Sequence, residues 1–195
     1  MKEAEERKAG DIRADAGREG CPVRQALYYV SGFLDGPMCG RCMPCSLGSF
    51  EARLRLEKIT RGLGEPGDLL ALRRIADDML EGSMCKKGKD TARFMLEWIQ
   101  ADAFGPHIEG RCPEKRCEAL IEYRVVPQMC TMCGLCKASC GHNAIFGEKR
   151  KPFLSGYPPF EIRQKRCVKC GECLKACPEG AIEVVDAAEH VEAGG

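Results

Sequence analysis

This sequence lacks a long apolar run, an excess of charge of either sign, and many aromatic side chains. No apolar stretch approaches the roughly 18 residues that cross a membrane, and residues 1–20 contain no apolar core of an export signal. The 30 basic and 29 acidic residues nearly cancel, which gives no indication of a nucleic-acid-binding surface. We therefore predict a soluble cytoplasmic protein without membrane insertion or nucleic-acid partner, in which residues 1–20 form a flexible charged tail.

Cysteine, by contrast, is abundant. The chain has 15 cysteines, an odd number, and only 3 histidines. A secreted scaffold held by disulfides is usually shorter and has an even number of cysteines. In a reducing compartment so many thiols indicate metal binding.

The first half of the chain has helical periodicity. Apolar residues recur at helical spacing in four segments, of which the first is PVRQALYYVSGFLDG. The second segment carries a stripe of Leu47, Phe50 and Leu54, and the third follows a possible N-cap at Asp68. Residues 21–108 are therefore predicted to form a small four-helix bundle whose apolar stripes pack its core.

The second half has a different pattern. Short β-type segments at 123–126, 160–162 and 182–185 alternate with two similar cysteine runs, which indicates an internal duplication. The predicted fold class is α+β, with the helical bundle followed by a ferredoxin-like domain and C-terminal tail over residues 109–195.

The two cysteine runs are the strongest motif. CTMCGLCKASC begins at Cys130 and CVKCGECLKACP begins at Cys167, and each has the spacing C-x2-C-x2-C-x3-C of bacterial two-cluster ferredoxins. In that pattern the fourth cysteine of each run binds the cluster of the other run. The predicted ligands of one [4Fe–4S] cluster are Cys130, Cys133, Cys136 and Cys177, and those of the other are Cys167, Cys170, Cys173 and Cys140. Two zinc sites are the alternative, although zinc modules rarely use such a run.

A third motif, CGRCMPC, places Cys39, Cys42 and Cys45 close together. Three thiolates can hold three corners of another cluster, so a fourth ligand is needed from elsewhere. Cys85 lies 40 residues after Cys45 and precedes the fourth predicted helix. Two antiparallel helices between them would return the chain to the same end of the bundle, which makes Cys85 the expected fourth ligand.

The order of these motifs resembles a known family. The first half of the chain is similar to the C-terminal cluster domain of the NADH-binding flavoprotein subunit of complex I. The similarity lies in the motif C-G-x-C-x-P-C, followed by two helices and then a cysteine before a last helix. With a trailing two-cluster ferredoxin, the chain resembles the corresponding subunits of multimeric [FeFe]-hydrogenases and NAD-linked formate dehydrogenases. The resemblance implies that Cys39, Cys42, Cys45 and Cys85 bind a cluster that exchanges electrons with flavin. Ser46 stands where that family usually has an arginine.

The flavin- and NADH-binding domain of that family is far longer than the residues that precede Cys39. The segment GLGEPG at 62–67 matches G-x-G-x-x-G, but it follows an amphipathic helix rather than a strand, so we interpret it as a turn between helices. This chain is therefore expected to bind neither FMN nor NAD.

Three cysteines remain after these assignments. Cys112 and Cys117 follow His107 closely, and Cys21 stands before the first predicted helix. Three thiolates and one imidazole form a tetrahedral Cys3His zinc site, and a comparable site is implied by the resemblance to hydrogenase subunits. A fourth iron–sulfur cluster or free thiols are the alternatives. His142 and His190 are weaker ligand candidates.

The sequence shows no catalytic constellation apart from these metal ligands. We therefore predict an electron-transfer subunit with three [4Fe–4S] clusters and a zinc ion. Its expected partners are a catalytic oxidoreductase, namely a tungsten or molybdenum aldehyde or formate oxidoreductase or a hydrogenase, and a flavoprotein NADH subunit or ferredoxin. A free-standing polyferredoxin and a redox-sensing regulatory module are the alternatives.

Overall fold

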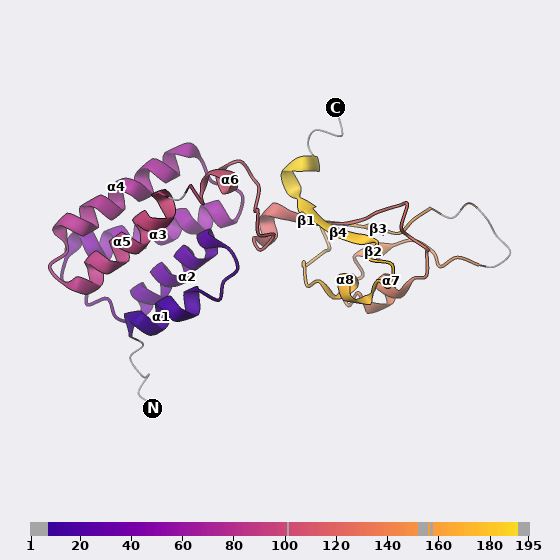
Figure 1. Cartoon of the computed structure of the whole chain (residues 1–195), viewed down its shortest axis with the longest axis horizontal. Helices are drawn as coiled ribbons and strands as arrows, with labels where there is room; N and C mark the ends of the chain where they lie inside the picture. The colour runs from indigo at the N-terminus through magenta and orange to yellow at the C-terminus, as the bar shows by residue number, and fades with distance from the viewer. Residues whose placement is uncertain (1–7, 101, 152–155, 157, 191–195) are drawn as a thin grey trace. The chain divides into compact units, whose positions relative to one another are not determined.

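The computed structural model describes residues 8–100, 102–151, 156 and 158–190 (Figure 1). The chain divides into two compact units, residues 1–120 and 121–195. We call them the helical unit and the two-repeat unit. The predicted boundary after residue 108 differs from this division, because the segment that follows α5 folds with the helices.

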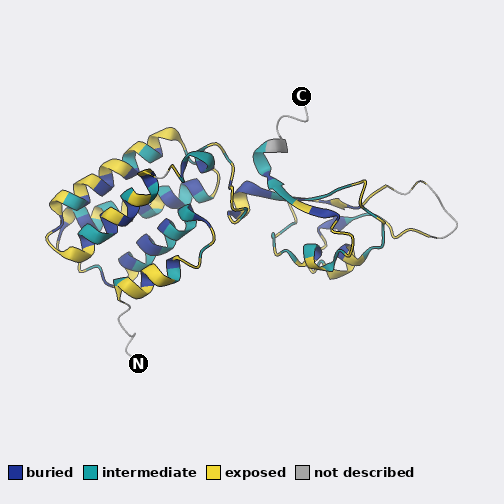
Figure 2. Ribbon diagram, in the orientation of Figure 1, coloured by how far each residue is buried: buried dark blue, intermediate teal, exposed yellow. Residues whose placement is uncertain are grey.

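The helical unit consists of six α-helices and a short 3-10 helix within its described residues. In chain order they are α1 (Ala9–Ala16), α2 (Pro22–Asp35), α3 (Met43–Thr60), α4 (Pro66–Gly82), α5 (Lys86–Gln100), α6 (Gly105–Ile108) and η1 (Glu118–Leu120). Helices α2 to α5 occupy the four segments predicted from periodicity. Helix α3 packs between α2 and α4, and α5 packs against α4 and α2. Buried residues face the neighbouring helices and exposed residues face outward (Figure 2).

The prediction that residues 1–20 form a flexible tail is wrong where the structure describes them. Helix α1 buries Ile12 and Ala16 completely in a cluster with Tyr29 and Phe94. A Cβ atom at Gly32 would lie 2.8 Å from Ile12 Cγ2, so the missing side chain at Gly32 lets α1 approach α2 closely. Two apolar residues one helical turn apart anchor this helix, and Arg13 adds an ion pair with Glu97 at 3.2 Å. Residues 1–7 lie outside the described part of the chain.

The prediction that the apolar stripe of the second helix faces the core is also wrong. In α3 the side chains of Leu47, Phe50 and Leu54 are 61%, 47% and 48% exposed. The inner face of α3 instead carries small residues, Ser49 and Ala52, in its first half and the fully buried Leu56 and Ile59 in its second half. A Cβ atom at Gly48, near this face, would lie 3.0 Å from Met79 Cγ of α4, so α3 and α4 are too close for large side chains there.

The N-cap of helix α4 lies three residues before the predicted one, Asp68. Glu65 is the N-cap and Pro66 is the first helical residue, a position where the fixed φ of proline is favourable. Asp68 lies in the first turn, is almost fully buried, and accepts a hydrogen bond from the Glu65 backbone N–H at 2.9 Å. It also forms ion pairs with Arg55 at 2.8 Å and Lys58 at 3.0 Å. Burial raises the pKa of Asp68, but these hydrogen bonds and charges outweigh it and lower the pKa below its usual value.

We expect Asp68→Ala to lower the free energy of unfolding by about 2 kcal/mol, because the helix loses its capping acceptor and two cations lose their partner. Chemical denaturation followed by the helical signal measures this loss. Asp77→Ala is the matched control, because Asp77 lies exposed on the same helix. Equal stability of the two variants would contradict the capping role.

The two-repeat unit combines short strands and helices. Its elements are β1 (Ile121–Val125), α7 (Leu135–Ser139), β2 (Ile145–Phe146), β3 (Glu161–Ile162), α8 (Glu172–Ala176), β4 (Ile182–Asp186) and η2 (Ala187–His190). Strand β1 pairs antiparallel with β4, with Tyr123 opposite Val184, and β2 pairs antiparallel with β3, with Ile145 opposite Ile162. Helices α7 and α8 pack together on one side of the strands (Figure 1). The mixed helical and small-sheet architecture agrees with the predicted α+β class.

Candidate metal centres

The cysteines of CGRCMPC and Cys85 meet at one end of the helical unit. Cys39, Cys42 and Cys45 lie in and just after the link from α2 to α3, and Cys85 lies between α4 and α5. All four line a single cavity. Gly40 has a φ of 71°, a left-handed conformation that glycine adopts easily and that turns the chain between the first two thiols. Cys42 and Cys45 are buried, whereas Cys39 and Cys85 are exposed.

The surroundings of this cavity favour negative charge. Helix α3 begins directly after Cys42 and α5 directly after Cys85, so the positive ends of two helix dipoles face the thiols. The backbone N–H of Met84 donates a hydrogen bond to Cys42 Sγ at 3.4 Å. Arg41, Lys86 and Lys87 also line the cavity. A cluster held by four thiolates carries net negative charge, so these residues fit such a group.

The thiols of this group influence one another. Burial raises the pKa of Cys45, the nearby Ser83 hydroxyl lowers it by a smaller amount, and the charges of Cys85, Cys42 and Cys39 raise it further. Four thiols in mutual electrostatic contact are the donor set that an iron–sulfur cluster requires.

The two cysteine runs have the same backbone conformation in the two-repeat unit. Met132 and Lys169, each two residues after the first cysteine of its run, have φ values of 57° and 60°. Gly134 and Gly171 have φ values of 80° and 78° and precede α7 and α8. Each run ends in a matching hydrogen bond, from Ala144 N–H to Cys140 Sγ at 3.4 Å and from Ala181 N–H to Cys177 Sγ at 3.3 Å. The duplication in the sequence is therefore also a duplication of local structure.

The last cysteine of each run lies with the first three cysteines of the other run. One cavity is lined by Cys130, Cys133, Cys136 and Cys177, and a second by Cys140, Cys167, Cys170 and Cys173. The two cavities are similar in size. This grouping has the crossed arrangement of the two-cluster ferredoxin pattern. His142 lines the second cavity and is itself exposed.

Buried thiols in both cavities have raised pKa values. Burial raises the pKa of Cys136, and the charges of Cys130, Cys133 and Cys177 add to this effect. Burial and the charge of Cys167 raise the pKa of Cys173 to about 11. Cys177 of the second run therefore raises the pKa of Cys136 in the first run, which agrees with their position in the same cavity.

Comparison with known protein families agrees with this geometry. Residues 25–111 match the NADH-ubiquinone oxidoreductase-F iron–sulfur binding region, and residues 129–181 match the 4Fe–4S dicluster domain. The chain joins two iron–sulfur domains. The resemblance predicted from the motifs is thus confirmed, and we refer below to the helical iron–sulfur domain and the dicluster domain.

The relatives of this chain belong to oxidoreductases. The NADP-reducing hydrogenase subunit HndC of Solidesulfovibrio fructosivorans is 31% identical over 77% of this chain and 31% of its own length. The NADP(+)-dependent formate dehydrogenase subunit beta of Moorella thermoacetica is 36% identical over 44% of this chain and 12% of its own length. The NADH-quinone oxidoreductase of Mycobacterium bovis has a subunit that is 31% identical over 48% of this chain and 21% of its own length. The chain thus spans a third or less of these relatives.

The remaining cysteines gather at a separate place in the helical iron–sulfur domain. The group consists of Cys21, His107, Cys112 and Cys117. The three cysteine sulfurs and an imidazole nitrogen of His107 all lie within 4.8 Å of one another. Cys21 Sγ lies 3.2 Å from His107 Nε2 and 3.7 Å from Cys117 Sγ. All four residues are at most 2% exposed. Three thiols and an imidazole at these separations match the donors and dimensions of a tetrahedral zinc site.

Hydrogen bonds within this buried group shift the pKa values of its members. Burial lowers the pKa of His107, but its hydrogen bonds to Cys112 and Cys21 outweigh burial and raise the pKa to about 10. The hydrogen bonds that Cys117 and Cys21 make to Cys112 lower the pKa of Cys112, which favours its thiolate. The Arg116 backbone N–H also donates to Cys112 Sγ at 3.3 Å. A bound metal ion would replace the protons that these buried groups share.

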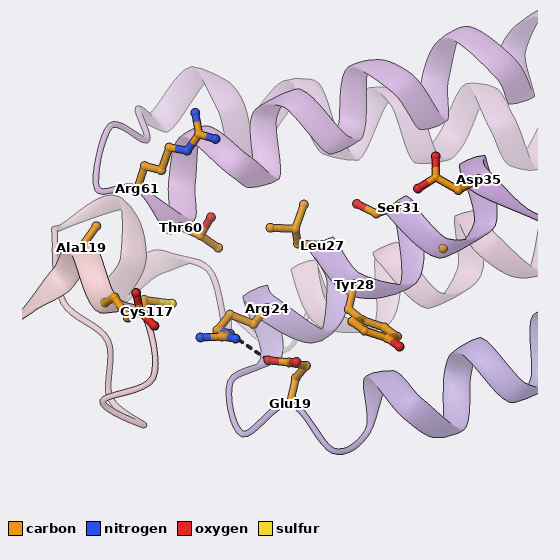
Figure 3. A pocket seen from close by; sticks show the side chains of 12 residues that line it. Glu19, Arg24, Leu27, Tyr28, Ser31, Asp35, Thr60, Arg61, Cys117 and Ala119 are labelled. Atoms are coloured by element: carbon orange, nitrogen blue, oxygen red, sulfur yellow. Dashed lines mark hydrogen bonds and ion pairs between the residues drawn. The ribbon is translucent and has the colours of Figure 1, made fainter. Parts of the chain in front are cut away.

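An open groove of about 730 Å³ in the helical iron–sulfur domain runs beside α2 and reaches this four-residue group (Figure 3). Among the residues that line the groove, Arg24 forms an ion pair with Glu19 at 2.8 Å. Cys117 also lines the groove and belongs to the four-residue group. The groove therefore borders the tetrahedral group rather than the cysteines of CGRCMPC.

Two further sequence predictions concern loops and the chain end. The first four residues of GLGEPG, 62–65, lie in the turn between α3 and α4, and Pro66 and Gly67 begin α4. Gly62 has a φ of 77°, and the interpretation of this segment as a link between helices is confirmed. The side chain of His190 lies outside the described residues. Within the described residues, none of the helices combines the length and apolar character needed to cross a bilayer.

Periodicity and ligand counting missed Ser83 and Gly88, which lie next to the Cys45 thiol. In the sequence, the only indication of a role for these two residues was that both lie close to Cys85 in the segment GSMCKKG.

Proposed function

We propose that this chain is an electron-transfer subunit that relays electrons through three [4Fe–4S] clusters. Cys39, Cys42, Cys45 and Cys85 hold one cluster in the helical iron–sulfur domain. The dicluster domain holds the other two, one on Cys130, Cys133, Cys136 and Cys177 and one on Cys167, Cys170, Cys173 and Cys140. Each cluster, when bound, accepts and releases one electron, and the protein supplies its thiolates, hydrogen bonds and burial.

One observation carries this proposal. Three cavities are each lined by four cysteines, and each set of four comes from the motif or crossed pair of runs expected for one cluster. All four ligands of each cluster are then protein thiolates, which leaves no ligand position for a substrate. Complete cysteine ligation suits electron transfer rather than substrate conversion.

We propose that the chain works in the cytoplasm within a larger oxidoreductase complex. The partners we propose are a catalytic subunit, such as a tungsten or molybdenum aldehyde or formate oxidoreductase or a hydrogenase, and a flavoprotein NADH subunit or ferredoxin. The hydrogenase, formate dehydrogenase and quinone oxidoreductase subunits among its relatives support this role. The exposed apolar face of α3, formed by Leu47, Phe50 and Leu54, also supports it, because contiguous apolar surface commonly marks protein contacts.

We further propose that Cys21, His107, Cys112 and Cys117 bind a structural zinc ion. The group is fully buried and joins the start of α2 to the segment after α5. Structural zinc sites have four protein ligands, whereas catalytic sites keep one position open. The ion would therefore stabilise the domain and take no part in electron transfer.

Metal and sulfide analysis tests these assignments. For protein purified without oxygen we expect about twelve iron, about twelve sulfide and about one zinc per chain, from three four-iron clusters and one Cys3His site. Elemental analysis and acid-labile sulfide determination give these values directly.

Other values would change specific assignments. About sixteen iron without zinc would move the four buried ligands to a fourth cluster. Mostly zinc with little iron, after anaerobic handling, would overturn the electron-transfer function. Co-purification tests the assembly: a native protein that is exclusively monomeric would contradict the subunit role.

A further inference from the structure

Ser83 is a buried polar residue that ligand counting does not explain. It lies in the link between α4 and α5, two residues before Cys85, and is 2% exposed. Its Oγ has no hydrogen-bond partner in the described part of the chain. A buried hydroxyl without a partner lowers stability, so such a group calls for another role.

The neighbours of Ser83 Oγ point to the cluster site. A Cβ atom built on Gly88 would lie 2.7 Å from Ser83 Oγ and 3.1 Å from Cys45 Sγ. The hydroxyl, the thiol and the first turn of α5 therefore crowd around one point. Gly88 is fully buried in the helix, where glycine is unfavourable, and its missing side chain is what allows this approach.

We propose that Ser83 is a positioning residue whose Oγ–H donates a hydrogen bond to Cys45 Sγ and thereby raises the reduction potential of the cluster in the helical iron–sulfur domain. This inference rests on the proposed function, which places a [4Fe–4S] cluster on Cys45. A cluster held there would supply one-electron chemistry, and the negative charge added on reduction would reside in part on the cysteine sulfurs. A donor to sulfur stabilises the reduced form more than the oxidised form, while the hydroxyl keeps its proton.

The electrostatics of the same segment agree with this role. The Met84 N–H donates to Cys42 Sγ at 3.4 Å, so two consecutive residues serve two buried ligands. Ser46, by contrast, directs its Oγ to the Cys42 carbonyl oxygen at 3.2 Å and not to a thiol.

A redox titration followed by EPR tests the inference on the full chain, with dithionite as the electron donor. We expect Ser83→Ala to shift the reduction equilibrium of one cluster about tenfold toward its oxidised form. For a one-electron couple, this shift lowers the reduction potential of that cluster by about 59 mV. The potentials of the other two clusters and the iron content should not change. Ser46→Ala is the matched control, because it removes a hydroxyl beside the same cluster without removing a donor to sulfur.

Two further variants keep the test decisive. Ser83→Thr retains the hydroxyl and should retain most of the potential. Gly88→Ala should lower the potential by displacing Ser83, and the double variant with Ser83→Ala should show no further decrease. Equal potentials in Ser83→Ala and Ser46→Ala would overturn the inference. So would loss of about four iron from both Ser83→Ala and Ser83→Thr, because Ser83 would then support only the fold.

These results are separable from failure of the proposed function. If the unaltered protein holds only about eight iron and lacks the signal of this cluster, the proposed function itself fails. If all clusters are present and the potential does not move, only the role of Ser83 fails.

Discussion

The double variant Cys130→Ala/Cys177→Ala should lose one cluster, whereas Cys173→Ala/Cys177→Ala should lose two. Cys177 lies with Cys130 in one cavity, and Cys173 lies in the other. A four-iron cluster that has lost a thiolate is less stable, and both substitutions of the first pair fall on the same cluster. We expect about eight iron per chain for the first pair and about four for the second, compared with about twelve for the unaltered chain.

The comparison is decided by iron content and EPR spin quantitation on anaerobically purified protein. Each double variant is the control for the other, because both carry Cys177→Ala and they differ only in which run carries the second substitution. If the runs bound their own fourth cysteines, the result would be reversed: Cys173→Ala/Cys177→Ala would keep about eight iron and Cys130→Ala/Cys177→Ala about four. That reversal would falsify the crossed ligand assignment.

Cys21→Ala should release the zinc ion and destabilise the helical iron–sulfur domain strongly. Cys21 precedes α2, while its three partners lie 86 or more residues later in the chain, so the site closes a long loop. Structural zinc contributes about 10–16 kcal/mol of binding free energy in zinc-finger peptides. With one of four ligands removed, we expect stability to fall by at least about 3 kcal/mol and the melting temperature by about 10 °C or more.

Zinc content and thermal unfolding measure the two parts of this prediction. Ser49→Ala is the matched control, because Ser49 is equally buried in the same domain and touches Met79 Sδ rather than a metal ligand. Hydrogen exchange should increase across residues 105–120 in Cys21→Ala and stay unchanged in Ser49→Ala. Retention of zinc and of the melting temperature in Cys21→Ala would exclude the four-ligand site.

The cysteine groups were predictable from sequence because cluster ligation imposes local spacing. Two residues between thiolates let one loop hold three corners of a cluster, so Cys130, Cys133 and Cys136 identify a site without any tertiary information. The crossed partner and Cys85 were predictable as well, since the repeat and two intervening helices determine where the chain returns. The structure brings these cysteines together in the groups of four that the motifs imply.

The faces of the helices were less predictable. Periodicity located α3 but assigned its buried face wrongly, because Leu47, Phe50 and Leu54 repeat at helical spacing and are nevertheless exposed. The inner face was decided by the distance to α4, because a Cβ atom at position 48 would lie only 3.0 Å from Met79 Cγ. Hydrophobic patterns report which residues can be buried, and they do not report how closely two helices approach.

The sequence by itself determined the chemistry of this protein: fifteen cysteines, two duplicated runs and the C-G-x-C-x-P-C motif specify iron–sulfur binding, because ligand type and spacing are local properties. Only the tertiary structure decided that α1 belongs to the helical iron–sulfur domain, that the domain extends to Leu120, and that Ser83 lies beside Cys45. These features depend on contacts between residues far apart in the chain, and such contacts arise only when the helices pack.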